Sequence, residues 1–427
     1  MLERRDFLQR AAAAAALIGL PLPQLEKQFC EEPPPIPSAE LYQSNEDAYW
    51  ARMRPQWLLA KDRINLNCGS VGCTPLPVLR AMIDHVLQAE EFAESYYPWF
   101  GYEENPPLHE VVDSLAAFLN VDRDDIALVR NATEANNTVG NGFDMKPGDE
   151  VVMTDQEHPG GRCVWDQRVV RHGIAIRQVT LPQPPASAGQ IVDLFEQAIT
   201  PRTRIVLFSH ITTVTGVVLP AKQICAMARR KGVLTHVDGA HVTGQIPLDI
   251  RDIGCDFYGS SPHKWLMAPK GTGFLYVRDE LQKQLYVNIV SGSWRDYSLK
   301  AYRFSNLGTS NLSIMIGLKA ALDFYRAIGP DRIFGRIHQL ARRVHDYVAQ
   351  KSQLKLINAS ADPFYGGMVT FAAAESTVKN IFDECAKRQI RIAGGAGHVR
   401  ISTHVFTQPA ELDALFEATD AALARST

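Results

Sequence analysis

Short apolar runs rich in β-branched residues recur through the middle of the chain, with longer stretches of helical spacing between them. They cover residues 126–130, 150–154, 174–181, 204–210, 233–237, 257–260 and 273–277. Strand-like runs that alternate with helices are typical of a mainly parallel sheet with helices on both faces. The pattern therefore predicts an α/β fold with a large, mainly parallel seven-stranded sheet. Active residues are expected at the ends of these strands and in the loops that follow them.

The pattern becomes helical from about residue 312. Two apolar faces appear with spacings of three and four residues: Leu318, Ala321, Leu322 and Tyr325, and then Ile333, Ile337, Leu340 and Val344. Short strands follow at residues 368–371 and 399–402. This mixture predicts a smaller α+β domain at the C-terminus.

The first residues read as an export signal followed by a linker. Arg4 and Arg5 precede a weakly apolar, alanine-rich stretch, and residues 31–37 are rich in glutamate and proline. A twin arginine before a short apolar stretch resembles a twin-arginine export signal, although Glu3 stands where such signals usually have serine or threonine. About ten apolar residues are too few for a bilayer, which needs roughly 20, so no stable membrane anchor is expected. An ordinary alanine-rich helix is the alternative.

Export by the twin-arginine machinery would carry the protein to the periplasm already folded, which suits a protein that acquires a cofactor in the cytoplasm. The predicted organisation is a signal and proline-rich linker over residues 1–37, and an N-terminal segment over 38–75 that packs with the small domain. The large domain then covers residues 76–305 and the small domain residues 306–427. No small-x-small cleavage site follows the apolar stretch.

Composition removes several classes of protein. There are 44 Lys+Arg against 47 Asp+Glu, a formal charge of −3. This balance argues against broad nucleic-acid binding, which needs a basic face, but it allows a local positive pocket. The seven cysteines are scattered and form no C-x-x-C pair, so a disulfide framework or a zinc site is not expected.

The strongest chemical signal lies at two consecutive strand ends. Asp238 ends one predicted strand, and Ser261, His263 and Lys264 follow the next, before a glycine-rich return at residues 270–273. This set suits pyridoxal phosphate, which needs a lysine for a Schiff base and a carboxylate to keep its ring nitrogen protonated. Hydroxyls, an imidazole and backbone N–H groups suit its phosphate.

The order of these motifs resembles the class V aminotransferases, a fold-type I group of pyridoxal phosphate enzymes, over roughly residues 60 to 410. The resemblance implies that Lys264 carries the covalent cofactor and acts as general base, and that Asp238 pairs with the ring nitrogen. It also implies that Ser261 and His263 bind the phosphate, and that His241 lies near the ring hydroxyl.

Other positions take their expected roles from the same resemblance. Ala132 and Thr133 would bind the phosphate, His158 would stack on the ring as a second catalytic residue, and Thr213 would approach the ring hydroxyl. Thr309 would reach the phosphate of the other subunit, which implies a homodimer. Arg400 would hold the substrate carboxylate, as a planar bidentate cation suits. The loop over residues 67–72 would cover the site, with Asn67 and Ser70 near the substrate.

The reaction is less constrained. Desulfuration is disfavoured because residues 391–398, before Arg400, contain no cysteine, and Cys385 falls in the preceding helical segment. The export signal and the sequence around Lys264 resemble a periplasmic branch of the family that matures the siderophore pyoverdine. That resemblance implies oxidative decarboxylation at Cα, turning a glutamyl side chain into a succinamide. A periplasmic aminotransferase, an epimerase or C–S lyase acting on another amino acid, and a non-catalytic binding protein remain alternatives.

Overall fold

The computed structural model describes residues 32–91, 102, 106–358 and 364–425, so the predicted export signal lies outside the described residues. The strands are β1 (Ile64–Asn65), β2 (Ile126–Val129), β3 (Glu150–Thr154), β4 (Ala175–Val179), β5 (Thr203–Ser209), β6 (Leu234–Asp238), β7 (Phe257–Ser260), β8 (Gly273–Val277), β9 (Lys355–Leu356), β10 (Met368–Ala372), β11 (Ile390–Arg391), β12 (Ala393–Gly395) and β13 (His398–Ser402).

The α-helices are α3 (Ala39–Ser44), α4 (Glu46–Met53), α5 (Leu76–Glu91), α6 (Pro106–Leu119), α7 (Ala132–Gly142), α8 (Pro159–His172), α9 (Ala188–Ala198), α10 (Ala221–Arg230), α11 (Ile250–Ile253), α12 (Asp279–Gln282), α13 (Ser313–Ile328), α14 (Pro330–Ala349), α15 (Glu375–Lys387) and α16 (Pro409–Leu423). Short 3₁₀ helices are η1 (Arg54–Gln56), η3 (Arg123–Asp125) and η4 (Tyr297–Phe304).

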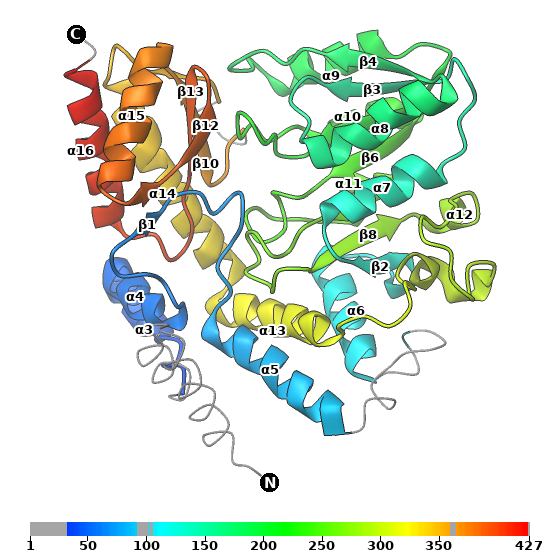
Figure 1. Ribbon diagram of the computed structural model, residues 1–427, viewed down its shortest axis with the longest axis horizontal. Helices are drawn as coiled ribbons and strands as arrows, with labels where there is room; N and C mark the ends of the chain where they lie inside the picture. The colour runs from blue at the N-terminus through cyan, green and yellow to red at the C-terminus, as the bar shows by residue number, and fades with distance from the viewer. Residues whose placement is uncertain (1–31, 92–101, 103–105, 359–363, 426–427) are drawn as a thin grey trace, which may run out of the picture.

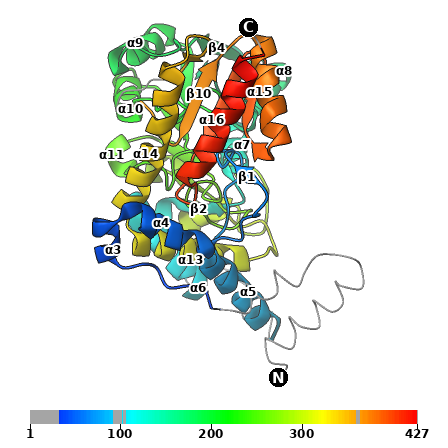
Figure 2. The same ribbon diagram turned by 90° about the vertical axis from the view of Figure 1, so that its left-hand side faces the viewer.

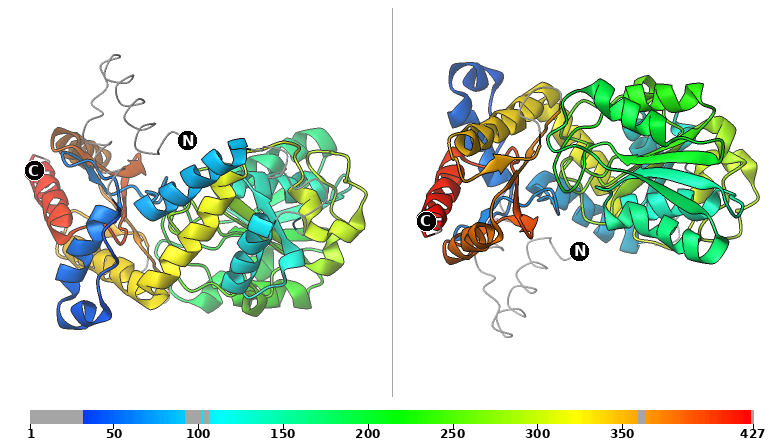
Figure 3. Two further views of the ribbon diagram at one scale, coloured as in Figure 1. Left: turned by 90° about the horizontal axis from the view of Figure 1, so that it is seen from below. Right: turned by 90° about the horizontal axis from the view of Figure 1, so that it is seen from above.

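The large domain is built on a sheet with strand order β2-β8-β7-β6-β5-β3-β4. β8 is antiparallel to both of its neighbours, and the other paired strands are parallel. The expected seven-stranded, mainly parallel sheet is therefore confirmed. Figures 1 and 3 show helices covering both faces of this sheet.

Alternate residues of the central strands explain the two layers of helices. On β5, Val206 and Phe208 belong to a core cluster with buried residues of α9 and α10, while Ile205 and Leu207 belong to a second cluster with α7 and α8. Side chains of a strand point to opposite faces in turn, so a strand buried on both faces is apolar throughout.

The small domain lies beside the large one and has its own sheet, of order β12-β13-β10-β9, and its own core. Helices α14, α15 and α16 cover this sheet, as Figure 2 shows from the side. The N-terminal segment joins it through β1, which pairs with β11. Helix α13 lies beyond the predicted boundary at residue 306 but buries its apolar face in the first cluster, beside α5 and α6.

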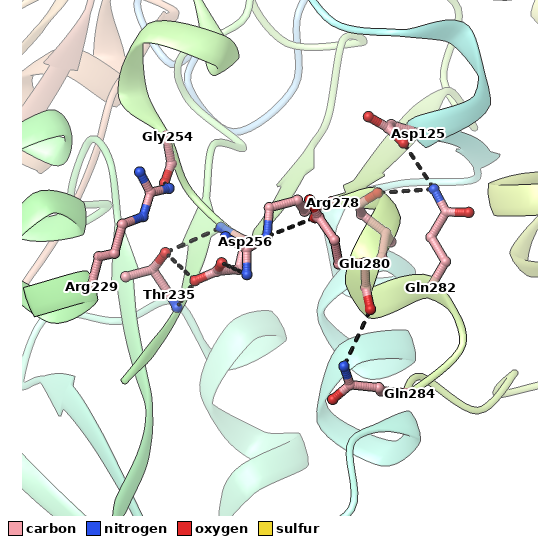
Figure 4. Close-up of polar contacts among 10 residues, drawn as sticks. Asp125, Arg229, Thr235, Gly254, Asp256, Arg278, Glu280, Gln282 and Gln284 are labelled. Carbon is pink, nitrogen blue, oxygen red and sulfur yellow. Dashed lines mark hydrogen bonds and ion pairs between the residues drawn. The ribbon is translucent and has the colours of Figure 1, made fainter. Parts of the chain in front are cut away.

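A cluster of polar side chains lies at the end of the sheet opposite to the expected site, where β6 and β7 begin and β8 ends (Figure 4). Asp256, directly before β7, accepts hydrogen bonds from the backbone N–H and hydroxyl of Thr235 at the start of β6, at 2.7 and 3.0 Å. Arg278, directly after β8, forms an ion pair with Asp256 at 3.0 Å. Figure 4 also shows Gln282 donating to Asp125. These contacts fix β6, β7 and β8 in register and so position the residues at the other strand ends.

In the described parts of the chain, no helix combines the length and apolar character needed to cross a membrane.

Candidate active site

The carboxyl ends of β5, β6 and β7 bring the principal chemical groups together. Parallel pairing places Ser209 opposite Asp238 and Asp238 opposite Gly259. The loops that leave these ends carry Thr213, His241 and Lys264. Because neighbouring parallel strands end at the same edge of the sheet, residues far apart in sequence meet there, as the sequence predicts.

Lys264 projects into this site and contacts His241. Its Nζ lies 3.3 Å from His241 Nε2. Burial lowers the pKa of Lys264 to about 8, while Asp238 opposes this effect and Arg400 adds to it. Gly72 of the N-terminal loop packs on the Lys264 backbone so closely that a Cβ at Gly72 would lie 1.9 Å from the Lys264 carbonyl oxygen. Only glycine can cover the lysine in this way.

Asp238 is held as a hydrogen-bond acceptor. Its Oδ2 accepts from Asn136 Nδ2 on α7 at 2.8 Å, and its Oδ1 accepts from the Ala240 backbone N–H at 2.9 Å. No lysine or arginine of the described residues forms an ion pair with it. Because both donors are neutral groups, neither forms an ion pair with the carboxylate, which suits it to accept from the ring nitrogen of the cofactor. Asn136 is a site residue that the sequence analysis missed, although it lies in the segment that opens α7.

The N-terminus of α7 lies against the loop that carries Lys264. Asn131 caps the helix by accepting from the Glu134 N–H, and the Ala132 N–H donates to Ser261 Oγ at 2.9 Å. These contacts use two of the first N–H groups, which have no partner inside the helix. Thr133 is exposed at the same turn, with Oγ1 2.5 Å from the position a Cβ would take on Gly160. His263 is anchored by a contact of 3.1 Å between its Nδ1 and the Thr272 carbonyl.

Arg400 reaches the site from β13 of the small domain. Its Nη1 donates to the Thr213 carbonyl at 2.8 Å, and its Nη2 donates to Asn67 Oδ1 at 3.1 Å and Ser70 Oγ at 3.0 Å. The side chain is buried, its Nε has no partner, and no carboxylate of the described residues pairs with it. Burial lowers the pKa of Arg400. A buried cation surrounded by neutral oxygens is suited to an anionic ligand.

His158 caps α8, accepting from the Gly160 N–H through Nδ1 at 3.0 Å, and its side chain is otherwise exposed. Burial of part of the ring and the nearby charge of Lys264 lower the pKa of His158. Its predicted stacking on the cofactor ring and its predicted role in catalysis stay predictions.

Two further expectations concern residues around this site. Thr309 is exposed and makes no contact with the gathered residues in the described part of the protomer, so its predicted role depends on a second subunit. The segment before Arg400 forms the β12–β13 hairpin, with Ala393 opposite Arg400 and no cysteine in it. Cys385 is buried in α15 and belongs to the same core cluster as Val399 and Ile401 of β13.

Glu157 is a buried acid that the sequence analysis also missed. Its Oε1 accepts from Thr154 Oγ1 at 2.5 Å and its Oε2 accepts from Ser209 Oγ at 2.6 Å. Burial, with a smaller contribution from Asp238, raises the pKa of Glu157 to about 7. In the sequence, only its position directly before His158 pointed to a residue near the site. That position gave no information about whether the side chain is buried.

We predict that Glu157→Gln stabilises the protein above pH 7 but not at pH 4. The folded state holds the proton more tightly than the unfolded state, whose carboxyl has a pKa of 4.5. The wild type therefore loses stability as pH rises from 4.5 to about 7. The full difference corresponds to about 3 kcal/mol, as an order of magnitude. Urea unfolding at several pH values measures it. Glu90→Gln, at an exposed carboxyl on α5, is the control and should show no such trend. A constant difference between Glu157→Gln and wild type across this range would contradict the prediction.

These groups fit pyridoxal phosphate. Lys264 is half-buried with no ion-pair partner among the described residues, Asp238 accepts hydrogen bonds from two neutral donors, and the α7 N-terminus lies against Ser261. No group of three or more histidine, cysteine, aspartate or glutamate side chains in the described residues is arranged to hold a metal ion.

Comparison with known proteins identifies the same chemistry. The aminotransferase class-V family model matches residues 73–415. Isopenicillin N epimerase from Streptomyces clavuligerus is 30% identical over 395 residues, covering 88% of this chain and 98% of that protein. Isopenicillin N epimerase from Amycolatopsis lactamdurans is 32% identical over 392 residues, covering 86% of this chain and 97% of that protein.

Solved structures share the fold. A mutant of C-DES with glycine covalently linked to the PLP cofactor has a TM-score of 0.75 at 25% identity, covering 86% of this chain and 99% of that chain. The cysteine desulfurase CsdA from Escherichia coli has a TM-score of 0.73 at 23% identity, covering 88% of this chain and 98% of that chain.

Proposed function

We propose that this chain, which belongs to the class V aminotransferase family and is a pyridoxal phosphate enzyme of that family, matures the siderophore pyoverdine in the periplasm. In this proposal it resembles PvdN and converts the glutamyl side chain into a succinamide by oxidative decarboxylation at Cα. The observation that supports an α-amino-acid substrate is Arg400, a buried cation that has no carboxylate partner among the described residues and that lies close enough to Lys264 to lower its pKa.

Each residue has a defined task in the proposed reaction. The bound cofactor supplies an electron sink for the negative charge that develops at Cα. Arg400 binds the substrate carboxylate and orients Cα toward Lys264. Lys264, whose pKa is lowered to about 8, moves a proton at Cα as general base. Asp238 holds the proton on the cofactor ring nitrogen, and Asn136 and Ala240 keep its carboxylate oriented.

The overall change consumes dioxygen as co-reactant. The group –CH(NH₂)COOH and one O₂ become –C(=O)NH₂, CO₂ and H₂O. The bond between Cα and the carboxyl carbon breaks, and Cα gains an oxygen and keeps its nitrogen. The dioxygen is reduced to the amide oxygen and water. This balance makes the product one carbon shorter than the substrate, with its nitrogen count unchanged.

Two features favour this assignment over desulfuration. The segment before Arg400 is a short hairpin without a thiol, and the described cysteine nearest to it in sequence, Cys385, is buried in α15. The twin arginine at Arg4 and Arg5 supports export to the periplasm. Cell fractionation tests the location, and protein recovered only from the cytoplasm would refute it.

A homodimer forms part of the proposal. Thr309 is exposed, and exposed apolar side chains that suit a subunit interface lie in the same region of sequence, at Tyr286, Val290 and Tyr297. Light scattering would detect a stable monomer, which would refute this part.

The decisive experiment is mass spectrometry of a glutamyl pyoverdine precursor incubated with purified, cofactor-loaded protein in air. Loss of one carbon with nitrogen retained is expected, and it should require oxygen and Lys264. Loss of nitrogen with all carbons kept would replace the proposal by transamination. An unchanged mass with inverted configuration would favour the second candidate, an epimerisation at Cα, which the two isopenicillin N epimerases support. An unchanged substrate would refute the siderophore assignment.

A further inference from the structure

His241 lies between two nitrogen-bearing side chains, and both of its ring nitrogens are engaged. Trp265 Nε1 lies 3.4 Å from His241 Nδ1, and Lys264 Nζ lies 3.3 Å from His241 Nε2. The imidazole is buried. The backbone of His241 is held by Gln245, whose amide donates to the His241 carbonyl and accepts from the Gly367 N–H.

The chemistry of the indole decides which ring nitrogen carries the proton. An indole N–H can only donate, so His241 Nδ1 must accept. Burial and the charges of Lys264 and Arg400, with a smaller effect of His158, keep the pKa of His241 well below its usual value. The ring is therefore neutral and has one proton, which must lie on Nε2.

The same reasoning then fixes the direction of the contact with Lys264. The Nε2–H of His241 donates, so Lys264 Nζ must accept. A protonated ammonium has three donors and no acceptor, whereas a neutral amine can accept. The opposite arrangement, with an ammonium donating to Nε2, would put the proton on Nδ1, directly against the indole N–H.

Trp265 cannot turn away from this contact. It is fully buried, and its ring stacks on His404 with a centroid distance of 5.5 Å and an interplanar angle of 8°. His404 stacks in turn on Phe406 at 4.6 Å. Gly367 also approaches so closely that a Cβ there would lie 2.7 Å from the indole.

We propose that Trp265 is a positioning residue that holds His241 in its Nε2–H tautomer, so that His241 donates a hydrogen bond to the Lys264 amine and keeps that amine ready to act as a base. This inference deepens the proposed function but does not depend on the substrate. Asp238 and Arg400 also face Lys264 and act in opposite directions on its charge. Trp265 acts on the lysine through the direction of a hydrogen bond.

The test compares two tryptophan substitutions. One removes an indole N–H that donates a hydrogen bond, and the other removes an indole N–H that has no partner among the described residues. Trp265→Phe removes the donor and keeps an aromatic ring against His404. Trp165→Phe is the matched control, because Trp165 is fully buried in α8 and its Nε1 has no partner. Long-range ¹H–¹⁵N NMR of histidine-labelled, cofactor-loaded protein reports the tautomer of His241. The His241 signal is identified because it is absent from the spectrum of His241→Gln.

Wild type and Trp165→Phe should show the Nε2–H tautomer at about pH 9, above the pKa of about 8 at which the Lys264 amine loses its proton. Trp265→Phe should show a mixture of tautomers. It should also shift by about one pH unit the titration of the visible absorbance of the lysine-bound cofactor, and lower kcat about tenfold with KM unchanged. In the His241→Gln background, Trp265→Phe should have no further effect on this titration.

A pure Nε2–H tautomer in Trp265→Phe, or an equal titration shift in Trp165→Phe, would overturn the proposal. If Trp265→Phe does not retain cofactor, the tautomer is read from the full chain without cofactor, and the same criterion applies. The tautomer and titration measurements use no substrate, so they can succeed or fail independently of the siderophore assignment.

Discussion

Lys264→Ala is expected to abolish the visible absorption band of the lysine-bound cofactor and to lower kcat/KM by about 10³-fold or more. The side chain is the proposed covalent attachment and the general base, and a positioned base alone contributes about 10² to 10⁴ in rate. Its low pKa, about 8, leaves a useful fraction of neutral amine at physiological pH. Absorbance spectroscopy after incubation with excess cofactor and steady-state kinetics measure the two effects.

The control for this substitution is Lys283→Ala, which removes an exposed lysine after α12. It should keep the absorption band and the rate of the wild type. Circular dichroism of Lys264→Ala should match the wild type, because the Lys264 side chain forms no ion pair within the described residues. A lysine-bound absorption band that survives in Lys264→Ala would refute the assignment of the attachment site.

Arg400→Met is expected to lower kcat/KM about 100-fold or more for a substrate with a free α-carboxylate, mainly through KM. A charge-assisted hydrogen bond contributes about 1.5–3 kcal/mol, and a bidentate contact loses two of them. The same substitution should leave the free energy of unfolding unchanged or raise it. Among the described residues the buried wild-type cation contacts neutral oxygens only, and removing an uncompensated buried charge relieves its desolvation cost.

Kinetics with a carboxylate substrate and with its methyl ester separate recognition of the carboxylate from other effects. The ester should bind the wild type weakly. Its affinity for Arg400→Met should be equal to or higher than its affinity for the wild type. Arg391→Met, at an exposed arginine on β11, is the matched control and should change neither activity nor stability. An unchanged KM for the carboxylate in Arg400→Met would mean that another group holds the substrate.

The sequence predicts the sheet and the central chemical pair well because both depend on local rules. Apolar runs fall on observed strands within a few residues, and Asp238 and Lys264 meet because parallel strands end at one edge. Asn136, Glu157 and Trp265 were not predicted. Each lies inside or beside a motif already noticed, yet its role depends on the partner that packing supplies from another part of the chain. Strand β12 was not predicted, because residues 393–397, with three glycines and two alanines, carry no strand-like alternation, whereas β13 overlaps the strand predicted at residues 399–402.

The N-terminal loop also has a consequence for synthesis on the ribosome. Gly72 packs on Lys264, and Asn67 and Ser70 contact Arg400, so this loop finds its partners only after most of the chain has been made. Until then Leu66 and Cys68, both fully buried in the final structure, lack the surroundings that cover them. Contacts of such long sequence separation form late and leave apolar surface exposed in the meantime. The large domain can therefore assemble around Lys264 before the loop closes, and a truncated chain that stops short of β13 would lack a completed site.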